Sequence, residues 1–423
     1  MSGTASQSLN SYTTLRKSNA WFFLMIMSFG LVLRLLVAEY GTFVSDMEFF
    51  ISWGDLLQRQ GSAGFFDAGW SDRLPGGILY LLWGLGEISN QWPDISQTLL
   101  YKLPAHIADV VLAGLLYWQV GRRSGETKGI IAGCLYFFNP FTWYISSLWG
   151  QMDAVQGLLL VAVLLMAYYR RTGTSAFLLA LATQFKPHSV VLLPLVLVLL
   201  WREKRKDFIR QIILFGSVFL GSIWLLALPF LLNEQRETRG LLVEPWQLMQ
   251  GQAGVAASRF PFASVNAFNF WVVVRSNWQP DSLMWLGVTY RTWGTLLFIG
   301  YAALVTFCLW RRKASLPAVF LAGSLLSLAA FTLLTRAHER HIFPFFVLFA
   351  FVLFDFDHRI TLPAYVMLSL SSLINGLFSY AMFYGGRFYS MPEAMISFMA
   401  LLPVLMCIIG LGLMAQQRIK QEV

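Results

Sequence analysis

Long apolar segments separated by short polar turns make up most of this chain. An α-helix needs about 20 mostly apolar residues to cross the hydrocarbon core of a bilayer. The pattern predicts an all-α integral membrane protein, a polytopic bundle of about 12 transmembrane helices in a single domain over residues 1–423. The predicted spans are residues 19–39, 98–120, 129–147, 154–169, 174–185, 188–201, 208–231, 285–310, 316–335, 341–354, 360–384 and 394–415.

Some apolar stretches are too short to cross. Residues 77–88 cover only about a dozen positions, which favours a re-entrant or interfacial segment. Phe49, Phe50 and Trp53 recur at helical spacing after the first span, and this predicts a short amphipathic helix at the membrane surface. The hairpin at Lys186-Pro187 divides the region 174–201 into two half-helices.

Composition supports the membrane assignment. Hydrophobic residues make up 57% of the chain and charged residues 13%, whereas soluble proteins average about 25% charged residues. The net charge of +9 does not indicate a nucleic-acid-binding domain, because the cations lie in short clusters between apolar segments. The three cysteines lie inside apolar stretches and are interpreted as packing residues.

The positive clusters also predict the topology. Short loops rich in Lys and Arg stay in the cytoplasm, and an apolar segment after Arg16-Lys17 with no small-residue cleavage site predicts a retained signal anchor. A cytoplasmic N-terminus places two long loops, about 40–97 and 232–284, on the outer face. The basic clusters that then share the cytoplasmic side are Arg122-Arg123 with Lys128, Arg170-Arg171, Arg202–Arg210, Arg311-Arg312-Lys313, Arg359, and Arg418 with Lys420.

The unusual polar residues gather on the predicted outer face. Asp46 and Glu48 would share one face of an extended chain but diverge in a helix, and the alternative is that Ser45 or Asp46 only caps a helix. Trp149 with Gln151 and Asp153 suits a sugar, because an indole stacks on sugar C–H groups. The alternative there is an interfacial Trp beside a helix N-cap.

A second group of polar residues is cationic. Arg336, His338 and Arg340 follow a predicted span and exceed what topology requires, and arginine binds phosphate through a fixed fork of donors. Lys186 needs an anion, for which a lipid phosphate, Asp109 and Asp153 are the candidates. Arg73 is a further candidate for phosphate. Asp109 itself, inside a predicted span with Lys102 on the same face, favours a structural ion pair or hydrogen bond.

In this order, the motifs resemble the GT-C class of polytopic glycosyltransferases, and in particular prokaryotic relatives of the mannosyltransferases of GPI-anchor synthesis. The resemblance covers about residues 34–344. It rests on Asp46-Met47-Glu48-Phe49-Phe50, Lys102-Leu103-Pro104 with Asp109, Asn139-Pro140, Trp149-Gly150-Gln151-Met152-Asp153, Lys186-Pro187, Ser264-Val265-Asn266-Ala267-Phe268-Asn269 and Arg336-Ala337-His338-Glu339-Arg340.

The resemblance implies an inverting transfer of a sugar, mannose by analogy, from a polyprenyl- or dolichyl-phosphate donor to a glycan or glycolipid acceptor. It places the catalytic base on Asp46, with Glu48 beside it, and we assign the donor phosphate to Arg336, His338, Arg340 and Lys186. Trp149, Gln151, Asp153, Asn266 and Asn269 are the candidates for sugar or acceptor binding. No cofactor is expected, and a divalent metal stays open.

Two other classes of function fit the same residues. A transporter or flippase of a lipid-linked or anionic substrate would also carry intramembrane charges and broken helices. A non-catalytic membrane subunit is the third possibility. In every case the expected location is the plasma membrane of a prokaryote or the endoplasmic reticulum membrane, with the site facing the periplasm, the exterior or the lumen.

Overall fold

The computed structural model describes residues 3–203, 207–232, 243–311, 314–385 and 390–416. Part of the second long outer loop, residues 233–242, lies outside these ranges. The same holds for several of the basic residues used to predict topology, namely Lys204, Arg205, Lys206, Arg312, Lys313, Arg418 and Lys420.

Seven of the described helical segments are long and apolar enough to cross a membrane. They belong to α1 (Gly3–Tyr40), α4 (Gln97–Ser124), α10 (Phe208–Ala227) with η4 (Leu228–Phe230), α13 (Tyr290–Trp310), α14 (Leu316–Leu333), α16 (His358–Tyr384) and α17 (Glu393–Gln416). The prediction of an all-α, multi-pass membrane protein is therefore confirmed. The predicted count of 12 crossings is not confirmed.

The other five predicted spans form shorter helices. Two helices end just before a proline, at Pro140 and at Pro187. Proline restricts the residue before it to extended backbone and cannot donate a hydrogen bond within a helix. α8 ends at Phe185 and η2 begins at Pro187, as the predicted pair of half-helices requires. These shorter elements are α5 (Glu126–Phe137), α6 (Pro140–Trp143), the π-helical turn η1 (Tyr144–Trp149), α7 (Asp153–Tyr168), α8 (Thr172–Phe185), η2 (Pro187–Leu192), α9 (Leu193–Glu203) and α15 (Phe343–Ala350).

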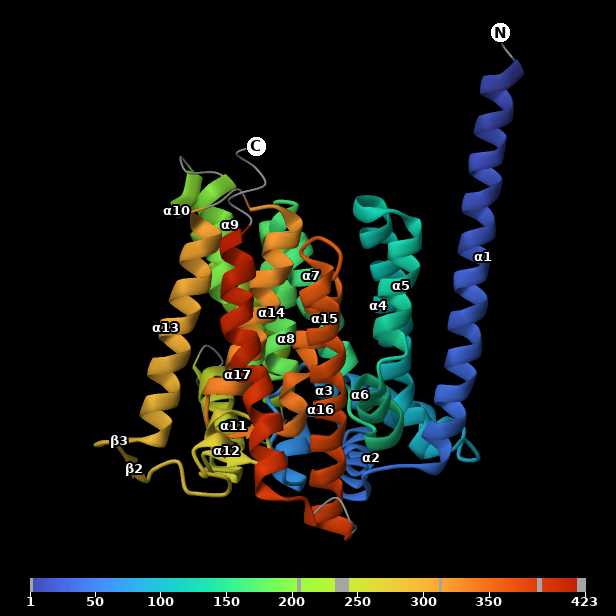
Figure 1. Cartoon of the computed structure of the whole chain (residues 1–423). Helices are drawn as coiled ribbons and strands as arrows, with labels where there is room; N and C mark the ends of the chain where they lie inside the picture. Colours follow the sequence, from blue (N-terminus) through green and yellow to red (C-terminus); the bar gives the residue numbers. More distant parts are fainter. Residues whose placement is uncertain (1–2, 204–206, 233–242, 312–313, 386–389, 417–423) are drawn as a thin grey trace.

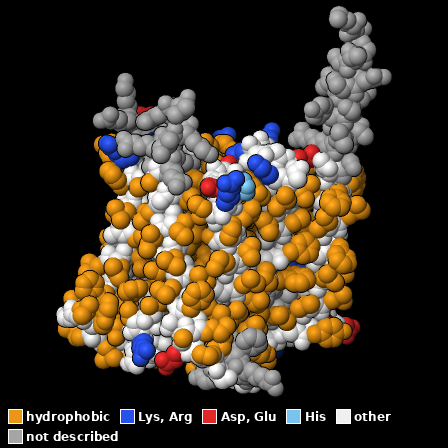
Figure 2. Space-filling view, in the orientation of Figure 1, with side chains coloured by type: hydrophobic (Ala, Val, Ile, Leu, Met, Phe, Trp, Pro, Cys, Tyr) orange, Lys and Arg blue, Asp and Glu red, His pale blue; other side chains and the backbone are white. Residues whose placement is uncertain are grey.

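The centre of the bundle is apolar throughout. All residues of α15 are buried, and this helix packs against α7 and α14. Figure 2 shows hydrophobic side chains covering the middle of the molecule, while Lys, Arg, Asp and Glu gather towards its two ends. This distribution suits a protein whose middle faces lipid.

The surface elements collect at one end of the bundle, which we call the cavity end. Figure 1 places α2 (Val44–Ala68), α11 (Glu244–Arg259), α12 (Phe270–Val273) and the β2–β3 hairpin (Met284–Trp285 with Val288–Thr289) at this end. The turn between α4 and α5 lies at the opposite end, as does the end of α9 (Figure 1). The two predicted outer loops therefore share one end, but the side of the membrane that it faces stays a prediction. The segment 77–88 forms α3 (Ile78–Gln91), which is too short to cross.

A short parallel ladder joins the second outer loop to the late cationic cluster. β1 (Ser264–Val265) pairs with β4 (Ala337–His338) in the register Ser264↔Ala337 and Val265↔His338. The backbone N–H of Arg336 also donates to the carbonyl of Phe262 at 2.9 Å. This ladder is followed by η5 (Glu339–Ile342). It fixes the cationic cluster against the outer loop.

A buried ion pair ties the early helices together. Arg34 of α1 and Asp109 of α4 are both fully buried, with Nη1 and Oδ2 2.6 Å apart. Arg34 also donates to the carbonyl of Phe137 at 2.6 Å, and Tyr136 donates to Asp109 at 2.6 Å. The predicted structural role of Asp109 is confirmed. Lys102 is also buried, and it donates to the backbone carbonyls of Ala38, Gly41 and Ser147.

Candidate functional site

A cavity of about 540 Å³ lies among α2, α11, η2 and η5, at the end of the bundle that is named after it. These segments are far apart in the sequence. Aromatic and small apolar residues form part of its wall, and cations, carboxylates and imidazoles form the rest. The charged and imidazole residues that line it are Asp46, Asp72, Arg73, Lys186, His188, Arg259, Arg336, His338, Glu339, Arg340 and His341. Most of the predicted site residues therefore meet in one place.

Asp46 lies in the first turn of α2 and points to the turn after η1. Its Oδ2 accepts hydrogen bonds from Trp149 Nε1 at 2.8 Å and from Gln151 Nε2 at 2.6 Å. Phe43 is the N-cap residue of α2, so neither Ser45 nor Asp46 is its cap. Burial raises the pKa of Asp46, but the Arg340 guanidinium and the two hydrogen bonds outweigh it and leave the pKa lowered. Asp46 is therefore ionised at neutral pH.

Arg340 lies between two carboxylates. Its Nη1 is 3.1 Å from Glu339 Oε1, and its Nη2 is 3.8 Å from Asp46 Oδ2. Glu339 is buried and also accepts a hydrogen bond from Ser379 at 3.1 Å. The Arg340 guanidinium lies over the Trp149 ring, with its central carbon 5.6 Å from the ring centroid. Arg340 is therefore held in place from three directions.

Two further cations at the cavity wall have carboxylates behind them. Lys186 forms an ion pair with Asp153, the first residue of α7, and Asp153 is fully buried. Arg336 pairs with Asp281 at 2.6 Å, and only 5% of the Asp281 side chain is exposed. Neither carboxylate lines the cavity. Of the partners left open for Lys186, the structure provides Asp153.

Three imidazoles lie side by side in the cavity. The ring of His341 is 5.0 Å from that of His188 and 5.3 Å from that of His338, measured between centroids. Burial, followed by the positive charge of Arg340, holds the pKa of His338 well below its usual value. Burial and the neighbouring histidines do the same to the pKa of His341. Both rings are therefore neutral at pH 7.

At another part of the wall, two arginines share a single carboxylate. Arg259 Nη1 bonds Asp72 Oδ2, and Arg73 Nε lies 3.3 Å from Asp72 Oδ1. Arg259 is the last residue of α11, and Arg73 belongs to the turn before α3. Arg259 was not predicted as a site residue. It is an isolated cation in a long loop, and its spacing from Asp72 in the sequence gives no signal that they meet.

Not every predicted site residue reaches the cavity. Glu48 is exposed and is absent from the wall, because residues two apart on a helix point in different directions. Asn269 is fully buried, where it caps α12 and donates to the carbonyl of Phe331 at 3.0 Å. Asn266 does line the cavity and accepts hydrogen bonds from Trp278 and Asn277. Trp149 is 2% exposed, and Phe43 stacks on its ring at 4.1 Å.

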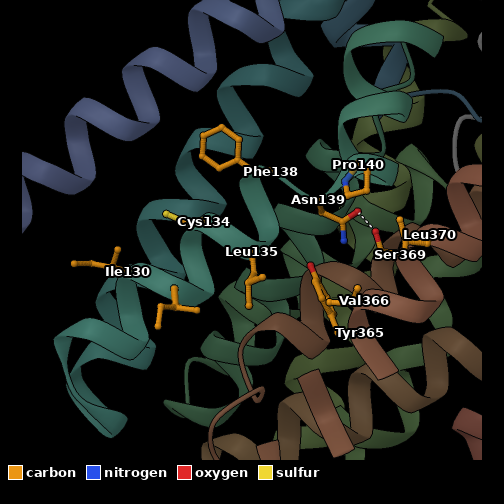
Figure 3. Close-up of a pocket in the computed structure, with 11 residues that line it drawn as sticks. Ile130, Cys134, Leu135, Phe138, Asn139, Pro140, Tyr365, Val366, Ser369 and Leu370 are labelled. Atoms are coloured by element: carbon orange, nitrogen blue, oxygen red, sulfur yellow. Dashed lines mark hydrogen bonds between the residues drawn. The ribbon is translucent and has the colours of Figure 1, made fainter. Parts of the chain in front are cut away.

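A second cavity, of about 370 Å³, lies between α5 and α16 (Figure 3). Its walls are apolar except at Asn139, Tyr365 and Ser369. Ser369 donates to Asn139 Oδ1 at 2.6 Å, drawn as the dashed line in Figure 3, and the same oxygen caps α6. Asn139-Pro140 therefore has a structural function in ending one helix and starting the next.

The donor set does not indicate a metal centre. In the described ranges, no three His, Cys, Asp or Glu side chains are grouped so that they could hold a metal ion. The carboxylates at the cavity are instead engaged by arginine, lysine, indole and amide groups.

The fold and the cavity define a multi-pass α-helical membrane protein with a cationic cavity at one end of its helices. Comparison with known families matches residues 76–239 to the family described as PIG-U, the GPI transamidase subunit. The matched segment is less than half of the 423 residues, so the chain is similar to this family over that segment. No curated protein matches the chain.

This similarity overturns the predicted function. The matched family is a subunit of a transamidase and not a glycosyltransferase of the GT-C class, so the predicted mannosyl transfer is wrong. The polyprenyl-phosphate sugar donor and the glycan acceptor are wrong with it. The physical reason is that carboxylates and cations gathered at one end of the bundle indicate an anionic, hydroxyl-bearing ligand. They do not say whether a bond in that ligand is broken.

Proposed function

We propose that the chain is a non-catalytic membrane subunit that holds the phosphate-bearing headgroup of a glycolipid for a partner enzyme of the transamidase class. The observation that carries the proposal is the match to the GPI transamidase subunit PIG-U. The matched segment 76–239 contains Trp149, Gln151, Asp153 and Lys186. The similarity therefore covers one side of the cavity.

The charges of the cavity support an anionic ligand. Lys186 and Arg336 line the wall while their carboxylates, Asp153 and Asp281, stay behind it. When the carboxylate lies behind the cation, the ion pair fixes the cation and leaves its remaining donors directed at the cavity. Arg340, together with the imidazole of His338, extends this surface. We assign these four side chains to the anionic headgroup around its phosphate, and Gln151 and Asn266 to hydroxyl groups.

The position of the cavity supports a ligand held in a membrane. It lies where the short helices η2 and η5 meet the outer loops, at the end of the lipid-facing bundle. A lipid headgroup can enter there while its acyl chains stay in the bilayer. In this proposal the cavity faces the lumen or the periplasm, as the basic loops at the opposite end predict.

Lipid binding can be measured on the full chain in nanodiscs. The probe is a short-chain phosphatidylinositol with a sugar on its inositol ring, and the control probe is the same sugar on diacylglycerol, which lacks phosphate. Arg340→Gln should weaken binding of the phosphate probe about tenfold, since it removes a charged hydrogen-bond donor. Equal binding of the two probes by the wild-type chain would contradict the proposal.

The subunit assignment needs a separate test. The affinity-tagged full chain, purified from its native membrane in mild detergent, should bring down a peptidase-like protein in fixed proportion. Purified chain alone should not release a peptide or transfer a sugar. Recovery of the chain as a lone protein, under conditions that keep other membrane complexes intact, would count against a subunit.

A further inference from the structure

Charge balance is uneven around the cavity wall. Lys186 and Arg336 each have one carboxylate, and Arg340 has two, Asp46 and Glu339. Arg73 and Arg259 share one, Asp72. Among the described cations that line the cavity, only Arg73 and Arg259 therefore have fewer carboxylate partners than positive charges.

The two guanidinium groups also keep donors for a ligand. An arginine carries five N–H donors. Arg259 gives one hydrogen bond to a described residue, Asp72. The Nε of Arg73 is buried beside Asp72 Oδ1, so the donors that Arg73 keeps for a ligand are those on its Nη1 and Nη2. Both side chains are more open than their shared carboxylate, at 21% and 26% exposed against 11%. Their free edges are therefore accessible from the cavity.

Aromatic rings hold both guanidinium planes. The central carbon of Arg259 lies 5.0 Å from the centroid of Trp70 and 5.2 Å from that of Phe49. That of Arg73 lies 5.5 Å from Trp53. A guanidinium stacked on a ring cannot turn its face to an anion, but its edge stays in a fixed orientation. Two such edges beside each other suit the oxygens of a phosphate.

We propose that Arg73 and Arg259, bridged by Asp72, form the primary binding site for the phosphate diester of the lipid headgroup. This inference rests on the proposed function and adds to it the chemical class of the bound group. A diester carries one negative charge, which matches the single excess positive charge of the pair. Arg340, already shared by two carboxylates, then contacts a neighbouring part of the headgroup.

The test uses the full chain in nanodiscs and the same phosphate-bearing probe. Arg73→Gln and Arg259→Gln should each weaken binding by about tenfold or more, because each removes a charged donor to the phosphate. Arg259→Lys, which keeps the charge and loses the fork, should give an intermediate loss. Arg123→Gln is the matched control. Arg123, at 19% exposed, is similar in exposure and is paired with an aspartate, Asp355. It belongs to the last turn of α4, which ends opposite the cavity end (Figure 1).

Asp72→Asn separates ligand binding from a structural role. Removing the shared carboxylate leaves two cations for the diester, so the affinity for the probe should rise. If the three residues only hold α11 against the loop, the same variant should instead lose affinity together with thermal stability. Weaker binding by Asp72→Asn, or unchanged binding by both glutamine variants, would overturn this inference. Loss of binding in Arg340→Gln alongside such a result would leave the proposed function standing.

Discussion

The indole Nε1 of Trp149 donates a hydrogen bond to Asp46 Oδ2 at 2.8 Å, although 103 positions separate the two residues in the sequence. The π-helical turn η1 brings Trp149 to this place, and Phe43, the residue before α2, stacks on the indole at 4.1 Å. π-helical turns are rare and often occur at functional sites. Asp46 therefore links α2 to the η1 turn and to Arg340.

Replacement of this carboxylate gives a first prediction. Asp46→Asn removes a negative charge from the cavity wall, so the phosphate-bearing lipid should bind a few-fold more tightly. The amide cannot accept both of the present hydrogen bonds as well as the carboxylate does. Stability should fall by about 1–3 kcal/mol, the usual effect of a lost buried partner. Thermal melting and lipid binding on the same preparation check both parts, and a loss of affinity without a loss of stability would contradict them.

The buried pair of Arg34 and Asp109 gives a prediction about stability alone. Either Arg34→Gln or Asp109→Asn leaves a charge in an apolar interior without its partner. Breaking a buried ion pair typically costs about 3–5 kcal/mol, so both variants should unfold at much lower denaturant concentration in detergent. The double variant Arg34→Met with Asp109→Leu should recover part of the loss, because no unpaired charge remains.

A matched control for that experiment exists at the basic end of the bundle. Arg123 and Asp355 form an ion pair at 3.1 Å, but 19% and 12% of their side chains are exposed. A pair that keeps some contact with solvent loses less when one partner is removed than a fully buried pair does, so Arg123→Gln should cost less stability than Arg34→Gln. Equal losses in Arg34→Gln and Arg123→Gln would show that burial is not the cause.

The histidines of the cavity predict how stability depends on pH. In the folded protein the pKa values of His338 and His341 lie well below 6.5, while the unfolded chain has the ordinary value of about 6.5. As pH falls below about 6.5, the unfolded state therefore takes up protons that the folded state does not, and folding loses stability. Melting temperature should fall between pH 7.5 and 5.5.

The double variant His338→Gln with His341→Gln should flatten that decline. Burial raises the pKa of Glu339, although Arg340 opposes this shift. Glu339 therefore acts in the opposite direction, because protonation of a buried carboxylate at lower pH stabilises the folded state. Comparison of the double variant with the wild-type chain isolates the histidines. A decline of the same steepness in both proteins would place the titrating groups elsewhere.

Sidedness can be checked with single cysteines in a chain whose Cys134, Cys308 and Cys407 are replaced. Asn90→Cys, in the last turn of α3, should react with a membrane-impermeant maleimide added from outside. Thr127→Cys, in the first turn of α5 beside the basic cluster Arg122-Arg123, should react only after the membrane is opened. The expectation follows from the retention of Lys and Arg loops in the cytoplasm. Labelling of both positions from the same side would refute the topology.

Much of the secondary structure could be read from the apolar pattern, because each helix in a bilayer satisfies its own backbone hydrogen bonds. The break at Lys186-Pro187 was predicted for the same local reason, since proline acts on its immediate neighbours. Crossing number could not be predicted in this way. Segments such as α7 and α15 are apolar because they are buried in protein, and burial in protein and exposure to lipid favour the same residues.

The sequence by itself determined that this is a multi-pass helical membrane protein and that Asp46, Lys186, Arg336 and Arg340 lie towards one end of it. Only the tertiary structure decided the partners. Lys186 meets Asp153, Glu48 turns away from Asp46, and Arg259 joins Arg73 across Asp72. Ion pairs between distant segments depend on how the helices pack, and this packing cannot be inferred from composition or residue spacing. The same charges suit a phosphate that leaves when its sugar is transferred and a phosphate that is only held, which is why the residues alone led to the wrong activity.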